Sequence, residues 1–408
     1  MYISGAVFLL CSGFSSCHTT NKTGAGADRA IRVTSDFDCG SIDTLVESSP
    51  GFLTGKTKHW KQKSSSDNQY YWFFFQLDNV AGKNVTIKLE DLIGIYRGEP
   101  HTIYTARTEP VFSYNKKEWS RIKDVKYDSA SHTFLFKTKF GRNRVWIAYA
   151  HPYPYEKETA FISSLPEQNK YLQMERLGES AESRPINLLT LTDPSVPDIN
   201  KKVVLITGLQ HAGEYVSGFF LEGMVSFLLS DSPEADRARK KTIYKIVPMM
   251  NPDGIFHGIT RFNNNMEDLN QEWDDDFTDS VHSPTEPEVA AVKKWIRNWL
   301  KEGKKIDIGL DVHSQGQEGE LNILHAPTDS LRGFVNNMNK YWPVEMIPMK
   351  FPGSANQCLA DEFHILSGTF EIPQSNVNGG KYLTIEDYHS YGKGTALGLS
   401  DYFEKNSP

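Results

Sequence analysis

One segment constrains the fold of this chain most, because an apolar strand leads into a helix across two polar side chains. Residues 203–208 form a short apolar run typical of a buried strand. Residues 215–228 carry apolar side chains at roughly helical spacing. His211 and Glu214 stand between them. Ligands of open α/β sheets usually bind at this carboxyl edge, and imidazole and carboxylate are ordinary zinc ligands. The same pair would also suit a plain helix start beside a polar histidine.

A third ligand-type residue lies about a hundred residues further on. Residues 306–314 form a second apolar run, and His313 stands near its carboxyl end. Together with His211 and Glu214 it would complete a His₂Glu set, which leaves a zinc ion one position for water. Asp311 could orient one of these ligands from behind. Taken alone, His313 would be a core histidine whose ring nitrogens have hydrogen-bond partners.

Other polar residues punctuate the same half of the chain. Residues 251–254, Asn-Pro-Asp-Gly, are typical of a turn, and Arg261 and the polar segment 268–273 follow. Glu371 interrupts the strand-like run 368–373. A buried acidic side chain is costly unless it faces a polar site, so Glu371 is either a site residue or a carboxylate on an edge strand.

The ordered set of HxxE, NPDG, an arginine, DLN, a strand-ending histidine and TFE resembles the zinc carboxypeptidase family, which includes the pancreatic carboxypeptidases. The resemblance covers residues 160–405. The preceding part resembles the small β domain of the cytosolic carboxypeptidase branch, at residues 72–77, 107–113 and 147–155. The resemblance implies a peptide-hydrolysing zinc enzyme.

Residue by residue, the resemblance assigns the catalytic centre. It implies that His211, Glu214 and His313 bind one zinc ion per chain. Glu371 matches the general base that activates water, and Arg261 matches the arginine that steadies the oxyanion.

The resemblance also concerns the substrate's terminal carboxylate. Asn270 matches the first member of an Asn-Arg pair, but Gln271 stands where the arginine is expected. Glutamine carries no charge and cannot form the fork that suits carboxylates. The requirement for a free terminus is therefore open, although Arg297 or Arg332 could restore the clamp. The family also has a tyrosine that contacts the substrate. The sequence offers four residues for this role and does not decide between them: Tyr341, Tyr382, Tyr388 and Tyr391.

Two folded parts are expected. Residues 31–158 contain short alternating runs such as 84–90 and 133–137, which predict an antiparallel β-sandwich domain. In residues 159–408 strands alternate with helices, for example at 286–300, which predicts an α/β domain with a mixed zinc carboxypeptidase-like sheet.

The beginning of the chain differs in composition. Residues 1–17 contain an apolar run followed by small residues and Cys17, which resembles a signal of the lipoprotein type, and residues 18–30 suit a tether. We therefore expect export as a lipoprotein of the bacterial periplasm or cell surface, with a membrane tether through lipidated Cys17. Cys39 and Cys358 could be free or joined.

A net charge of −7 argues against nonspecific nucleic-acid binding. The expected function is hydrolysis of an amide bond, with a peptide or another amide-containing partner as substrate. Two alternatives remain: a zinc deacylase, esterase or amidase acting on a glycan or cell-wall fragment, and a catalytically inactive binding module. The sequence does not indicate an oligomeric state.

Overall fold

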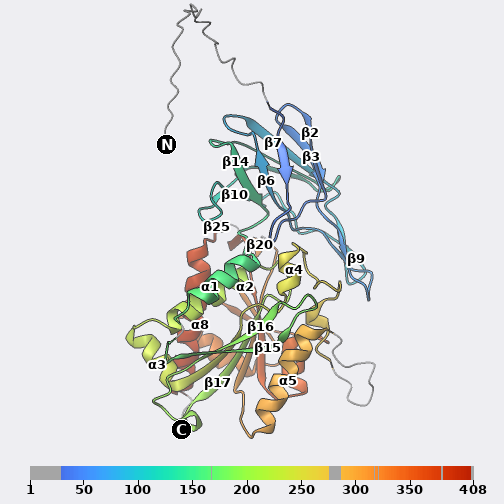
Figure 1. Ribbon diagram of the computed structural model, residues 1–408. Coiled ribbons are helices and arrows are strands. Elements are labelled where there is room, and N and C mark those ends of the chain that lie inside the picture. Colours follow the sequence, from blue (N-terminus) through green and yellow to red (C-terminus); the bar gives the residue numbers. More distant parts are fainter. Residues whose placement is uncertain are drawn as a thin grey trace, which may run out of the picture. The chain divides into compact units, whose positions relative to one another are not determined.

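The computed structural model describes most of the chain after the N-terminal segment (Figure 1). The described residues are 29–166, 168–274, 286–316, 318–319, 321–377 and 380–405. Residues 31–408 form one compact unit. The predicted signal segment, Cys17 and nearly all of the predicted tether lie outside the described residues.

The first part of this unit is built on two five-stranded sheets. In β7 (Asn84–Glu90) alternate residues, Val85, Ile87 and Leu89, are buried, as the alternating pattern predicts. Strand pairs in both sheets are antiparallel, except for the parallel pair β3–β7. The predicted β-sandwich domain is confirmed. In sheet order, the strands are β1 (Arg32–Thr34), β6 (Phe74–Asp78), β14 (Arg144–Ala148), β10 (Val111–Ser113) and β11 (Ser120–Arg121), then β12 (Asp124–Asp128), β13 (Thr133–Lys139), β7, β3 (Phe52–Lys56) and β2 (Thr44–Ser49).

A smaller four-stranded sheet projects from this domain and ends in a tight hairpin. Its strands are β4 (Trp60–Lys61), β5 (Asn68–Gln69), β8 (Gly94–Tyr96) and β9 (Glu99–His101). Arg97 and Gly98 connect β8 to β9, and both have positive φ, 53° and 81°. A two-residue hairpin loop with both φ values positive is a type I′ turn.

The second part is built on an eight-stranded mixed sheet. Strands β18, β17, β19 and β23 pair in parallel at its centre, and antiparallel pairs flank them. Because parallel strands end at the same edge, the register sets Gly208 beside Val312, and His313 beside Glu371. The order is β15 (Leu172–Glu179), β16 (Pro185–Leu191), β18 (Thr242–Val247), β17 (Lys202–Gly208), β19 (Ile308–Ser314), β23 (Leu366–Ile372), β21 (Ile323–Ala326) and β22 (Glu345–Pro348). A three-stranded sheet comprises β20 (Glu318–Gly319), β24 (Asn376–Val377) and β25 (Lys381–Tyr382).

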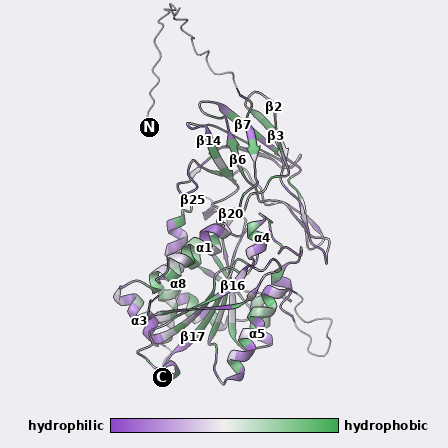
Figure 2. Ribbon diagram, viewed as in Figure 1, coloured by the Kyte–Doolittle hydropathy of each residue, from purple (hydrophilic) through white to green (hydrophobic). Residues whose placement is uncertain are grey.

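Helices cover both faces of the large sheet, so its central strands are apolar on both sides. In β17, Val204 and Ile206 belong to one core, and Val203 and Leu205 belong to the other. In Figure 2 β17 is largely green, and α5 carries both green and purple residues. The α/β prediction is confirmed. The helices are α1 (Tyr155–Ser164), α2 (Val216–Leu228), α3 (Pro233–Lys241), α4 (Pro252–Phe256), α5 (Pro287–Lys301), α6 (Arg332–Met338), α7 (Ala355–Asp361) and α8 (Ile385–Lys405).

The two parts share one continuous apolar core. The rings of Trp72 and Tyr215 lie 4.2 Å apart between centroids, and the hydroxyl of Tyr71 donates to the Thr260 carbonyl at 3.3 Å. Helix α1 runs through the predicted domain boundary between residues 158 and 159. No break in the backbone marks that boundary, which stays a prediction.

The structure also describes the predicted turn at residues 251–254, two cysteines and the character of the helices. The predicted turn at residues 251–254 begins the short helix α4, because Asn251 caps it and Pro252 occupies its first position. Cys39 and Cys358 are both free and buried. Among the helices in the described part of the chain, none combines the length and apolar character that a membrane span needs.

Candidate metal centre and active-site cavity

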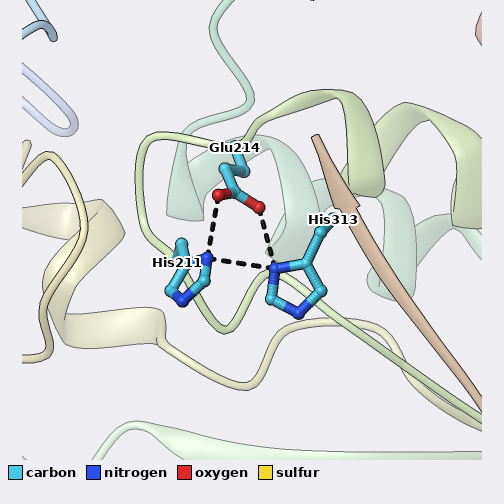
Figure 3. Close-up of side chains that lie close together, drawn as sticks. All are labelled: His211, Glu214 and His313. Atoms are coloured by element: carbon cyan, nitrogen blue, oxygen red, sulfur yellow. Dashed lines mark hydrogen bonds and ion pairs between the residues drawn. The ribbon is translucent and has the colours of Figure 1, made fainter. Parts of the chain in front are cut away.

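Three ligand-type side chains converge at the carboxyl edge of the large sheet (Figure 3). His211 lies in the loop after β17, Glu214 lies just before α2, and His313 lies in β19. All three are buried, and their candidate ligand atoms lie within 4.8 Å of one another.

The ligand atoms face a common point. Nδ1 of His211 lies 2.8 Å from Oε1 of Glu214, and Nδ1 of His313 lies 2.9 Å from Oε2. The two Nδ1 atoms are 3.0 Å apart. The backbone N–H of Ser314 donates to Oε2 of Glu214 at 2.9 Å and so helps to hold the carboxylate in place.

A second carboxylate stands behind each imidazole. Nε2 of His211 lies 3.0 Å from Oδ1 of Asp268, and Nε2 of His313 lies 2.6 Å from Oδ2 of Asp311. An Nε2–H that donates to a carboxylate leaves Nδ1 with its lone pair directed at the shared point. Two lone pairs at 3.0 Å cannot bond to each other, so this arrangement fits a cation between them.

The charges at this point also favour a cation. Burial lowers the pKa of His313, but the carboxylates of Asp311 and Glu214 outweigh it and raise that pKa well above its usual value. Burial raises the pKa of Glu214, yet His211 and His313 lower it overall. Two imidazoles and a carboxylate, each supported from behind, are the donor set that zinc takes in sites with an open position.

Asp268 joins several parts of the site. Besides His211, its carboxylate accepts from Nε of Arg261 at 2.7 Å, from Nε2 of Gln271 at 3.0 Å and from the backbone N–H of Asn270 at 3.0 Å. Burial raises the pKa of Asp268, but Arg261 and His211 lower it overall. The sequence indicated Asp268 only as part of a polar segment. Its spacing of two residues from Asn270 was the available signal.

Glu371 lies beside the candidate ligands. It belongs to β23, which lies between β19 and β21, so the edge-strand alternative is wrong. Burial and the nearby charge of Glu214 raise the pKa of Glu371 to about 7, although the histidines and Arg261 oppose this shift. Glu371 lines the same cavity as His211, Glu214 and Arg261.

The predicted substrate-binding residues line the same cavity, together with Arg261. Oδ1 of Asn270 accepts from the Ala355 N–H at 2.9 Å. The two arginines considered as substitutes lie elsewhere, since Arg297 pairs with Glu362 and Arg332 pairs with Asp329. Neither of them lines the cavity.

The cavity has a volume of about 210 Å³ and a second wall that the sequence did not reveal. Tyr71, Tyr96, Arg97 and His101 of the β domain line it opposite the ligand-bearing strands. The four tyrosines considered from the sequence are absent from its described lining. No local pattern in the aromatic run at residues 70–75 singles out Tyr71 as the residue that reaches the cavity.

Fold and site together place the chain among the α/β proteins that present a candidate metal-binding site at the carboxyl edge of a mixed sheet. Residues 159–320 match the family model described as zinc carboxypeptidase, and residues 33–150 match the cytosolic carboxypeptidase N-terminal domain. The chain therefore carries a zinc carboxypeptidase domain preceded by that N-terminal domain, and the predicted resemblance is confirmed.

Several known proteins are similar to this chain. Cytosolic carboxypeptidase 6 of Mus musculus is 31% identical over 258 residues, which cover 60% of this chain and 46% of the relative. Cytosolic carboxypeptidase 2 of Macaca fascicularis is 24% identical over 380 residues, covering 87% and 42%. This chain thus spans less than half the length of these relatives. A metallo-carboxypeptidase structure from Burkholderia cenocepacia shares the fold, with a TM-score of 0.78, 24% identity and coverage of 93% and 100%.

These comparisons correct one prediction. Export as a lipoprotein is wrong, because the domain matched at residues 33–150 and the curated relatives are cytosolic carboxypeptidases by name. The prediction rested on the apolar run before Cys17. An apolar run followed by small residues and a cysteine is not specific to a secretory signal, so this pattern alone was misleading.

Proposed function

We propose that this chain is a zinc-dependent peptidase that hydrolyses an amide bond, with one zinc ion bound by His211, Glu214 and His313. One observation carries the proposal: three ligand atoms converge on one point, and the cavity beside that point also contains Glu371 and Arg261. Family membership supports zinc as the metal.

The residues have distinct roles in this proposal. Zinc in such a site acidifies a bound water and polarises a carbonyl group. Glu371 accepts the proton of the attacking water on its carboxylate and then delivers it to the leaving nitrogen. Arg261 stabilises the negative charge that develops on the carbonyl oxygen, and Asp268 fixes the direction of its guanidinium.

Asn270 and Gln271 bind the part of the substrate beyond the scissile bond. Both line the cavity, and both carry neutral amides. The relatives are named carboxypeptidases, which favours a peptide cut near its carboxyl end.

Gln271 supports a second candidate, an amidase, deacylase or esterase that acts on substrates without a free carboxylate, such as a glycan or cell-wall fragment. A neutral amide discriminates less between a carboxylate and a carboxamide than a guanidinium does. The third alternative, an inactive binding module, is disfavoured because both the ligand set and Glu371 are present.

A metal assay combined with a substrate panel tests the proposal. Purified full-length protein is analysed for zinc content and then given peptides with free or amidated ends, together with acylated amines and esters. We expect about one zinc per chain and hydrolysis of peptides that chelation abolishes and zinc restores. Zinc-loaded protein that cleaves only acylated amines or esters would favour the second candidate. Zinc-loaded protein that cleaves no substrate would contradict the proposal.

A further inference from the structure

The described lining of the cavity contains two arginines, and they differ in what they already bind. Arg261 is engaged with Asp268 at 2.7 Å and lies 3.9 Å from Glu214. Arg97 has no acidic partner among the residues that the structure describes. One guanidinium on the cavity wall is thus available to an anion from outside.

The backbone at Arg97 is unusual for its residue type. It occupies the first central position of the type I′ turn between β8 and β9, with φ at 53°. Asn, Asp and Gly are preferred there, because other side chains crowd the backbone when φ is positive. The conformation of the turn therefore does not account for an arginine at this position. The cavity that its side chain lines does account for it.

A chain of contacts links Arg97 to Gln271. The guanidinium carbon of Arg97 lies over the ring of Phe351, 5.8 Å from its centroid, and both residues line the cavity. Two residues later, Gly353 packs so closely on Gln271 that an added Cβ would lie 3.0 Å from the Gln271 carbonyl oxygen. Arg97 and Gln271 therefore border the same end of the cavity.

On the ligand-bearing wall the charged donor beside Gln271 is Arg261, and it is already engaged, because its Nε and the Gln271 amide both donate to Oδ2 of Asp268. The side-chain amide of Gln271 donates to Asp268, and Oδ1 of Asn270 accepts from Ala355. A carboxylate that enters a partly buried cavity needs charge-assisted donors to replace its lost hydration. Of the two arginines in the described lining, Arg97 can supply them without giving up an acidic partner.

We propose that Arg97 binds a carboxylate of the substrate, from the β-domain wall, at the end of the cavity bordered by Gln271. The proposal rests on the proposed peptidase function and names its substrate class as peptides that carry an anionic group near the scissile bond. That group is either the terminal carboxylate or an acidic side chain, and the two sources can be separated by experiment.

The kinetic test uses full-length zinc-loaded protein and two matched substrate pairs. One pair differs only in a free or amidated end, and the other differs only in Glu or Gln beside the scissile bond. Arg97→Gln should raise KM by about tenfold or more for the anionic member of one pair, because it removes charge-assisted hydrogen bonds. Its kcat should stay within about twofold of wild type, and Arg97→Lys should recover part of the loss.

Arg142→Gln is the matched control. Arg142 is also exposed, and its guanidinium also lies over a tyrosine ring, that of Tyr114 at 5.3 Å, but it does not line the cavity. This variant should leave both KM values unchanged. An effect of Arg97→Gln on the end pair identifies the terminal carboxylate, and an effect on the Glu/Gln pair identifies a side chain. Equal KM values for wild type and Arg97→Gln in both pairs would overturn the proposal.

A binding measurement separates this proposal from the proposed function. Peptides whose scissile amide is replaced by CH₂–NH are titrated into wild type and Arg97→Gln, with free and amidated ends and with Glu or Gln. Selective loss of affinity for an anionic peptide would support the role of Arg97 even if no peptide is hydrolysed. Identical affinities in an active enzyme would reject that role and leave the peptidase function intact.

Discussion

The two walls of the cavity are built in different ways. On the wall formed by the large sheet, His211, Glu214 and His313 are buried, and each is held by at least one further polar group. On the β-domain wall, Arg97 is exposed at the tip of a hairpin and rests on aromatic rings. Catalytic groups need to be held in a fixed geometry by the residues around them. The comparison predicts that changes on the first wall reduce turnover and changes on the second alter substrate preference.

The largest effect is expected from His313→Ala, which removes one ligand atom from the convergence point. Bound zinc should fall to near background, and hydrolysis should fall by more than the roughly 10- to 100-fold that outer-shell changes cost. Zinc content and turnover check this. His257→Ala is the control, because His257 pairs with Glu182 outside the cavity. A His313→Ala protein that keeps stoichiometric zinc would show that His313 is not a ligand.

Glu371→Gln tests the same wall without touching the candidate ligands. Glutamine keeps the shape but cannot accept a proton from water, so kcat should fall by roughly 10²- to 10⁴-fold while zinc content is retained. Glu345→Gln, on the exposed part of β22, is the control. If turnover stays within a few-fold of wild type, another group performs the proton transfer.

Asp268→Asn tests whether the carboxylate behind His211 tunes the metal site. Removing its charge should weaken zinc binding by roughly 10- to 100-fold, as measured by competition with a chelator. Asp311→Asn is the matched variant, because Asp311 supports His313 in the same way. Unchanged zinc affinity in both variants would mean that the convergent ligands alone determine it.

The smallest effect is expected from Gln271→Arg, which adds a third arginine to the cavity that Arg97 and Arg261 line. Where the terminal carboxylate is the anion that Arg97 binds, the wild-type preference for a free over an amidated end should change little, because Arg97 already supplies a cation. In the Arg97→Gln background the same change should restore about tenfold preference. Equal gains in both backgrounds would show that positions 97 and 271 act independently.

The sequence predicted the fold and the ligand-bearing wall for one physical reason. Strand ends of a parallel sheet meet at one edge, so polar residues that end apolar runs, such as His313 and Glu371, had to come together. Arg97 and Tyr96 could not be found this way, because their place in the cavity depends on how a distant hairpin packs. Asp268 was recognised only as part of a motif, since its partners converge on it through space.

The core that Trp72 and Tyr215 share across the two parts has a consequence for folding. Because that apolar surface is continuous, neither part can lose its packing without exposing the other to water. Cooperative unfolding should therefore include both, and a metal bound at the sheet edge would raise the melting temperature of the β domain although none of the three candidate metal ligands lies in it. Metal binding in the α/β part would thus also stabilise the β domain against thermal unfolding.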